Sequence, residues 1–237
     1  MIKLIDISTA SEQNQTHLYS YAQRKDMNGS RRISKEYAEW FDKAIGDYVS
    51  TIKIEWQPTE SYLQFNALFI TFSFQNIDVR RRQSALDASP ANSLSPEFYN
   101  VDRFYKRMCR ALLGSNYARR RSQQPLVIAA ADVNGTRYWK TAGPLHNVHI
   151  HSIWVFRPGQ IERFNAAARN AINDPASNAF DFHKVHIEPI YAMNTEGDGA
   201  SKLSSYVAKF IGFNATDMLI GRDVDIYPKP LASETVG

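Results

Sequence analysis

Cysteine is nearly absent from this sequence, and long apolar runs and a nucleotide-binding phosphate loop are missing. The one cysteine, Cys109, excludes an internal disulfide and a metal site built from several cysteines. No run of about 18 apolar residues occurs, and the first ten residues lack the apolar core of a signal peptide, so we expect no membrane span and a cytoplasmic protein. The absence of a G-x-x-x-x-G-K-[ST] motif excludes an ATP-driven helicase module from the chain.

The composition is otherwise that of a globular protein. Hydrophobic residues make up 43% and charged residues 22% of the 237 residues, which suits one large domain or a domain with a small extension. The net charge of +4 and the pI of about 9.1 are mildly basic, as in many nucleic-acid-binding proteins and in many others.

Arginine clustering says more about partners than the total charge does. Phosphate contacts require grouped cations, because each neutralised phosphate releases counterions. The alternative is that these arginines only keep a loop and a helix face in water. The clusters that we predict to contact DNA are Arg80, Arg81 and Arg82, and Arg119, Arg120 and Arg121.

The order of expected elements predicts an α+β fold. Residues 1–60 are predicted to be a helical extension, with Ser34 as the N-cap of an amphipathic helix, and residues 223–237 an extended tail. The domain between them, 61–222, has strands and helices in an order that favours a mainly antiparallel sheet with flanking helices. The expected strands are 62–74, 126–131, 148–156 and 185–190, and the expected helices are 95–114, 158–171 and 200–211.

The strand NVHIHSIWVF carries a pair of histidines. Because side chains alternate along a strand, His149 and His151 face one side of the sheet, about 6–7 Å apart at the backbone, and Ile150 faces the other. Two imidazoles on one face can converge on a cation. Taken alone, the pair could also be two ordinary polar residues on an exposed face.

A tyrosine and a lysine lie one turn apart on the expected helix 200–211. In SKLSSYVAKF, Tyr206 and Lys209 share a helix face. A tyrosine that attacks a phosphodiester forms a phosphotyrosine ester and so keeps the bond energy for rejoining, and a nearby lysine can hold the phosphate or the phenolate. The other interpretation is a half-buried tyrosine beside a solvated lysine.

In this order the motifs resemble the HUH endonuclease superfamily, in the branch of rolling-circle replication initiators with one catalytic tyrosine. His-hydrophobic-His on a strand is followed about fifty residues later by Tyr-Val-x-Lys-Phe on a helix, and LFITFSF at 68–74 is similar to the family's first motif. The resemblance covers residues 65–213. It implies a central antiparallel sheet of about five strands with the His-x-His strand in its middle.

The resemblance also implies a site. By carry-over, His149 and His151 bind a divalent metal, Mg²⁺ or Mn²⁺, that polarises the scissile phosphate. Tyr206 is the nucleophile, and Lys209 is the accessory cation. The family usually takes a further ligand from the preceding strand.

Three residues are candidates for that further ligand. Asp132, at the end of LVIAAAD, lies across a long hairpin from His149 and is the first choice. His146 is the alternative, although its spacing of three from His149 points it away in a regular strand. Glu188 is a weaker candidate.

Two aromatic residues in the hairpin loop are further candidates for binding. Tyr138 and Trp139 lie between Arg137 and Lys140, a combination that suits stacking on unpaired bases. They could equally anchor the loop.

The expected function is therefore metal-dependent nicking and rejoining of single-stranded DNA, or of a hairpin at an origin, to initiate rolling-circle replication of a plasmid or phage. A separate helicase would act in trans. Alternatives with the same chemistry are a conjugative relaxase and a single-strand transposase. Alternatives of other classes are a DNA-binding protein that never cuts and a cupin-like metal enzyme, although the helical N-terminal region counts against a cupin.

Overall fold

The structure, a computed structural model, describes residues 32–53, 56–74, 96–133, 148–173, 180–190, 200–209, 211 and 224–229. A five-stranded sheet lies at its centre, with the strand order β4-β1-β3-β2-β5. All four neighbouring pairs are antiparallel. The expected α+β fold with a mainly antiparallel sheet is confirmed, and the His-x-His strand β3 is the central one. The strands are β1 (Ala67–Phe74), β2 (Leu126–Val133), β3 (Val148–Val155), β4 (Phe182–Pro189) and β5 (Val224–Tyr227).

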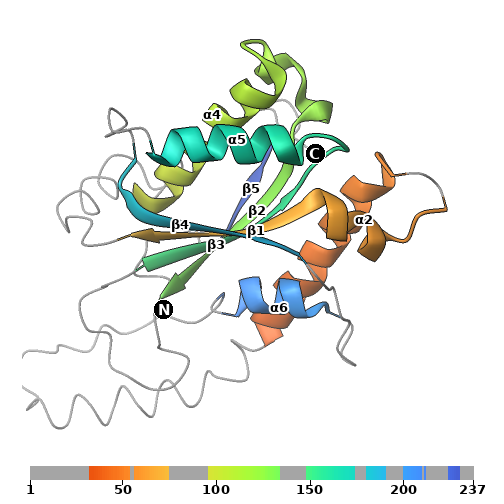
Figure 1. Cartoon of the computed structure of the whole chain (residues 1–237). Helices are drawn as coiled ribbons and strands as arrows, with labels where there is room; N and C mark the ends of the chain where they lie inside the picture. The colour runs from red at the N-terminus through yellow and green to blue at the C-terminus, as the bar shows by residue number, and fades with distance from the viewer. Residues whose placement is uncertain are drawn as a thin grey trace, which may run out of the picture.

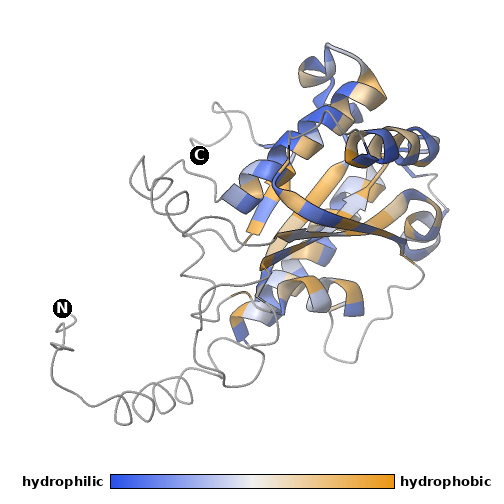
Figure 2. Cartoon of the chain, turned by 60° about the vertical axis from the view of Figure 1, so that its left-hand side comes forward, coloured by the Kyte–Doolittle hydropathy of each residue, from blue (hydrophilic) through white to orange (hydrophobic). Residues whose placement is uncertain are grey.

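Helices cover both faces of the sheet (Figure 1). On one face lie α4 (Pro96–Leu113) and α5 (Ile161–Asn173), which bury aromatic residues such as Phe104 and Phe164 against Trp154 of β3. On the other face lie a helix at residues 32–50, α2 (Thr59–Asn66) and α6 (Lys202–Ala208). The middle of the sheet is apolar in Figure 2, whereas the edge strand β4 is partly hydrophilic and the helices are hydrophilic on their outer sides. The sheet is therefore the middle of three layers, as its apolar strands require.

The alternation of β3 distributes its side chains between the two cores. Ile150 and Trp154 belong to the core under α4 and α5, and Ile153 and Val155 belong to the core under the helix at 32–50. The chain between α4 and β2 forms two short 3-10 turns, η1 (Tyr117–Arg119) and η2 (Arg121–Gln123).

Three expectations about elements need correction. Residues 62–66 are helical: α2 begins after Pro58, buries Tyr62 and Leu63, and exposes Phe65, so packing overrides the strand preference of aromatic residues. Residues 224–227 are not a free tail but the edge strand β5, with Tyr227 buried. Ser34 lies inside its helix rather than at the cap, and its hydroxyl donates to the carbonyl of Ala208 at 2.7 Å.

The helix at 32–50 is part of the main fold rather than an appendage. Phe41, Ile45 and Val49 are fully buried in the core that also contains Ile153 and Val207. The helix expected in residues 1–60 is present at 32–50 and packs in the same core as the sheet, and residues 1–31 of the expected extension lie outside the described residues. None of the described helices is long and apolar enough to cross a membrane.

Candidate active site

Polar side chains gather on the sheet face that carries α6. Within β3, His149 pairs with Ser73 of β1 on one side and with Asp132 of β2 on the other. His151 pairs with Thr71 of β1. Because directly opposed residues of neighbouring strands point to the same face, these five side chains form two rows across the middle of the sheet.

The hydroxyls of β1 fix both imidazole rings. Thr71 Oγ1 lies 3.0 Å from His151 Nδ1, and Ser73 Oγ lies 2.8 Å from His149 Nδ1. The two rings are nearly parallel, with an interplanar angle of 10° and centroids 6.4 Å apart. Burial lowers the pKa of His149 below its usual value, and the Asp132 carboxylate only partly offsets this effect. The His149 imidazole is therefore neutral at neutral pH.

Asp132 joins the histidine strand to α6. Its Oδ2 lies 2.6 Å from His151 Nε2 and 2.7 Å from Lys209 Nζ, and all three side chains are about nine-tenths buried. Burial alone raises the pKa of the Asp132 carboxyl, but hydrogen bonds from His151 and Lys209 outweigh it and lower the pKa below its usual value. A carboxylate thus stays ionised beneath α6.

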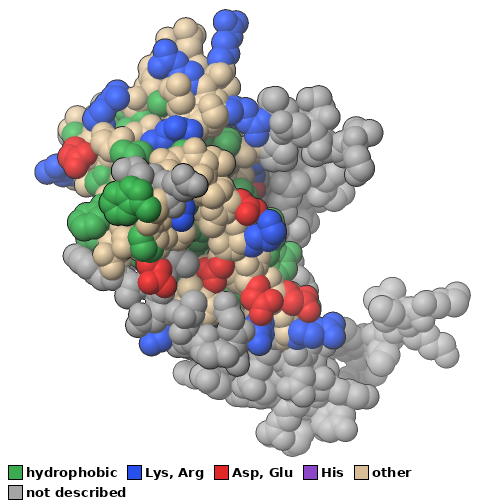
Figure 3. Space-filling model, turned by 90° about the vertical axis from the view of Figure 1, so that its right-hand side faces the viewer, with side chains coloured by type: hydrophobic (Ala, Val, Ile, Leu, Met, Phe, Trp, Pro, Cys, Tyr) green, Lys and Arg blue, Asp and Glu red, His purple; other side chains and the backbone are tan. Residues whose placement is uncertain are grey.

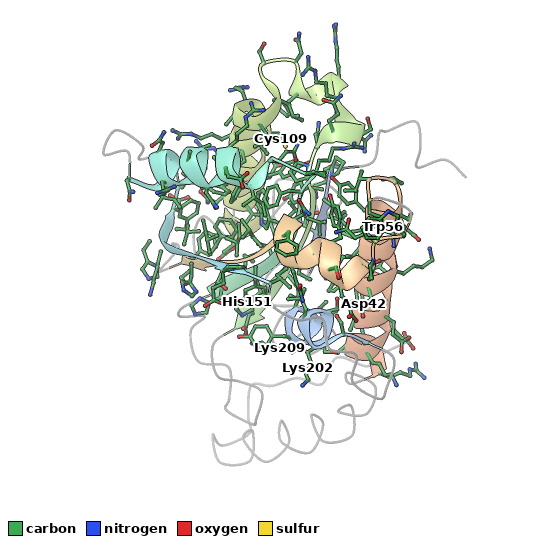
Figure 4. All side chains as sticks on the ribbon, turned by 45° about the vertical axis from the view of Figure 1, so that its right-hand side comes forward. Asp42, Trp56, Cys109, His151, Lys202 and Lys209 are labelled. Atoms are coloured by element: carbon green, nitrogen blue, oxygen red, sulfur yellow. The ribbon has the colours of Figure 1, made fainter. Side chains whose placement is uncertain are left out.

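Tyr206 lies over this cluster with an open side. Its ring centroid is 5.1 Å from that of His151 and 5.8 Å from that of Phe69, and 46% of the residue is exposed. Lys209 Nζ lies 3.9 Å from the centroid of the Tyr206 ring. Figure 4 shows His151 and Lys209 on the same side of the sheet, beside α6. The phenol is therefore accessible from solvent while its ring is held between an imidazole and an ammonium group.

The helix at 32–50 holds α6 at both ends. At the first turn, Asp42 accepts hydrogen bonds from Ser201 N (2.6 Å), Ser201 Oγ (2.7 Å) and Ser204 Oγ (2.6 Å). Ser201 also caps the helix by accepting from Ser204 N at 3.1 Å. At the last turn, Ser34 binds the Ala208 carbonyl. These contacts determine where Tyr206 and Lys209 stand relative to β3.

His149, His151 and Asp132 are residues of the types that bind a divalent cation. Imidazole nitrogens and a carboxylate are ligands that Mn²⁺ accepts, and the hydroxyls of Thr71 and Ser73 orient the two imidazoles through their Nδ1 atoms, as outer partners of ligating histidines do. Among the described residues, however, no three His, Cys, Asp or Glu side chains stand close enough together to hold a metal ion. The residue types therefore fit the ion, but their side chains are not already arranged around a metal position.

The structure brings together five of the residues predicted from the sequence: His149, His151, Asp132, Tyr206 and Lys209.

Glu188 shares their face but lies on the edge strand β4, where it pairs with Phe69 in the sheet and with His186 at 3.5 Å. Arg119, Arg120 and Arg121 lie before the start of β2, at the other end of that strand from Asp132, and so are not beside Tyr206. The predictions that fall outside the described residues concern His146, Tyr138, Trp139, Arg80, Arg81 and Arg82.

Sequence reasoning missed three residues of this site. Thr71 and Ser73 were part of a recognised strand motif, and alternation along β1 could have placed them on the histidine face. Asp42 had no such signal, because its hydrogen bonds with Ser201 and Ser204 span 159 and 162 residues of sequence.

Comparisons with known proteins leave the family open. A scan against protein-family models, a search of curated proteins and a search of solved structures each found no match for this chain.

Proposed function

We propose that this protein cuts and rejoins single-stranded DNA with Tyr206 as the nucleophile, in the manner of the HUH endonucleases that initiate rolling-circle replication. The observation that carries the proposal is the position of an exposed phenol against His151 and Lys209, above a strand whose two histidines share one face with Asp132. The sequence motifs alone predict the same role for each of these residues. The motifs and the geometry therefore support the same chemistry independently.

In the proposed reaction, the phenol oxygen of Tyr206 attacks the scissile phosphorus. The bond from phosphorus to the 3′-oxygen breaks, a 5′-phosphotyrosine ester forms, and the phenol proton is balanced by the proton that the departing 3′-hydroxyl gains. Lys209, whose Nζ lies over the Tyr206 ring, would supply a positive charge to stabilise the phenolate or the phosphate. Attack by a 3′-hydroxyl on the ester reverses the steps and rejoins the strand.

A divalent metal held by His149, His151 and Asp132 would supply Lewis-acid polarisation of the phosphate. The chain's own contribution is to orient both imidazoles through Thr71 and Ser73. In a cell, the free 3′-hydroxyl would prime a polymerase at an origin hairpin of a plasmid or phage. A separate protein would supply the helicase.

The test is covalent capture of DNA. The protein is incubated with a pool of single-stranded oligonucleotides and Mn²⁺, and adducts are resolved on denaturing gels and mapped by mass spectrometry. We expect the adduct on Tyr206 and its loss in Tyr206→Phe, which removes only a hydroxyl. Tyr99→Phe is the matched control, since Tyr99 is also an exposed helical tyrosine.

Wild-type adduct levels in Tyr206→Phe would refute the nucleophile assignment. Complete absence of adducts, with DNA binding intact in both proteins, would instead support a DNA-binding protein that never cuts.

A further inference from the structure

A strongly basic surface lies on the opposite side of the sheet from Tyr206. Residues 96–123, which form α4 and the two 3-10 turns, contain seven Lys and Arg but only two Asp and Glu. Residues 32–50, on the side of α6, contain three basic and four acidic residues. In Figure 3, Lys and Arg gather at the upper end of the molecule, where Figure 1 shows α4, and most acidic side chains lie lower. The net charge of the chain is small, but its basic residues are concentrated on the side of α4.

The exposed cations of this region form one surface. Arg103, Lys106 and Arg110 recur at three and four residues on α4, so they share a helix face. Arg163 of α5 joins them, because its Nη2 donates to the Ala111 carbonyl at 3.3 Å. We name as the basic helical surface Arg103, Lys106, Arg110, Arg119, Arg120 and Arg163, all of which are exposed.

The acidic residues of the same region neutralise little of this charge. Glu97 is buried, and Asp102 is buried beneath Lys106, to which it is bound at 2.6 Å. Arg103, Arg110 and Arg163 form no ion pair with a carboxylate among the residues that the structure describes. Like charges gathered at this density repel one another, and a bound polyanion relieves that repulsion.

The aromatic rings nearby indicate which polyanion fits. The guanidinium group of Arg103 lies 5.7 Å from the centroid of Tyr99 and 5.6 Å from that of Phe180, and Arg110 lies 5.9 Å from Tyr117. Binding of unpaired bases depends on open aromatic faces for stacking, and here cations cover those faces. Cations fixed on rigid helices suit the regular phosphates of a duplex instead.

We propose that the basic helical surface binds the phosphate backbone of double-stranded DNA, as a second DNA site on the face opposite Tyr206. The choice of DNA over another duplex rests on the proposed function. A duplex on α4 and α5 and a single strand at Tyr206 would occupy different faces of the sheet. One molecule could therefore hold the duplex arm of an origin while it cuts the unpaired strand.

Some of these arginines also have structural contacts, which the test must avoid. Arg120 Nη1 donates to the Leu113 carbonyl at 3.3 Å, as Arg163 does to Ala111, so both stabilise the end of α4. The test variant is therefore the triple change Arg103→Gln, Arg110→Gln and Arg119→Gln. Its matched control removes three exposed charges from the other side of the sheet, with Arg32→Gln, Lys35→Gln and Lys43→Gln.

The measurement is fluorescence anisotropy with a labelled blunt duplex of about 20 base pairs across a salt series, alongside a single-stranded oligonucleotide and phosphatidylserine vesicles. We expect the test variant to bind duplex at least about tenfold more weakly at low salt. Its log–log salt slope should flatten by about 0.9 for each phosphate that the variant no longer neutralises. The control triple should stay within about twofold of the parent. Adduct formation on single strands should persist in both.

The inference would be overturned if the two triple variants lost duplex affinity equally. It would also be overturned if the salt dependence of duplex binding were unchanged in the test variant. Loss of single-strand or vesicle binding, with duplex binding retained, would assign the surface to that ligand instead. If no adduct forms on any DNA but the duplex loss is selective, the proposed function fails and the duplex surface stands.

Discussion

At the residue scale, Asp132 is the group on which the candidate site depends most. Its carboxylate contacts His151 Nε2 on one side and Lys209 Nζ on the other, and so connects the central strand with α6. Its lowered pKa reflects these two partners. Because all three side chains are largely buried, removing one partner leaves a charge away from water, and that cost exceeds the net gain from forming the pair.

This asymmetry predicts the outcome of a double-mutant cycle. Asp132→Asn should destabilise the protein by up to about 3–5 kcal/mol, since it leaves the Lys209 ammonium without its carboxylate. Adding Lys209→Met should recover part of that loss, with a coupling energy of about 0.5–3 kcal/mol. Urea denaturation followed by circular dichroism measures all four proteins. If the double variant is as unstable as the sum of the single changes, the two residues do not act as a buried pair.

The histidines give a second prediction at this scale. If Asp132, His149 and His151 bind a metal, then His149→Ala and His151→Ala should each lower Mn²⁺ affinity at least about tenfold and stop Mn²⁺-dependent cleavage. EDTA should stop cleavage by the parent protein. Calorimetric titration with Mn²⁺ gives the affinity without reference to activity. His186→Ala is the control, because His186 is exposed on β4. Full cleavage in EDTA would exclude a metal-dependent site.

At the element scale, α6 needs external support. Its seven residues, Lys202–Ala208, are too few for a helix that is stable by itself in water. Asp42 and Ser34 supply the support from a neighbouring helix, at the first and the last turn. Tyr206 lies between these two anchors, so Asp42 is a positioning residue for the proposed nucleophile.

We therefore expect Asp42→Ala to reduce the rate of adduct formation at least about tenfold while affinity for single-stranded DNA stays nearly unchanged, because small displacements of a reacting group are costly. Single-turnover rates and anisotropy separate the two effects. Asp47→Ala is the matched control on the same helix, where Asp47 forms an exposed pair with Lys43. Asp42→Asn should recover part of the rate through its amide oxygen. A parallel loss of rate and DNA affinity would argue against positioning.

The sequence predicted some elements well because their signals are local. Pro96 at the start and Gly114, with φ of 84°, at the end mark α4, and both ends were expected. The pairing of Asp132 with His149 across the hairpin was also expected and is confirmed. By contrast, α2 and β5 depend on tertiary contacts. Tyr62 donates to the Phe156 carbonyl at 2.7 Å, a contact that no local pattern indicates.

At the scale of the whole molecule, the sheet separates two faces with different properties. Buried Cys109, whose pKa burial raises to about 12, lies in the aromatic-rich core on the side of α4. The candidate active site lies on the side of the helix at 32–50. An amphipathic pattern showed that this helix buries one face, but it could not show against which surface. For that reason the sequence predicted the helix but not its packing against the sheet.

The last prediction tests this layer. Phe41 is fully buried in the core beneath α6, whereas Trp40, its neighbour on the same helix, is 46% exposed. Phe41→Ala should cost about 3–5 kcal/mol of unfolding free energy, because it removes a buried ring and leaves a cavity. Trp40→Ala changes a larger side chain but should cost less than about 1 kcal/mol, as surface substitutions usually do.

The losses of unfolding free energy in Phe41→Ala and Trp40→Ala are measured from their urea midpoints, with the m-value held constant. The same core supports Val207 and Ala208 of α6, so Phe41→Ala should also loosen the site. Hydrogen exchange of α6 amides should become faster in that variant and not in Trp40→Ala. If Phe41→Ala is as stable as the parent, the helix at 32–50 is a separable extension after all, and the anchoring of Tyr206 through Asp42 loses its basis.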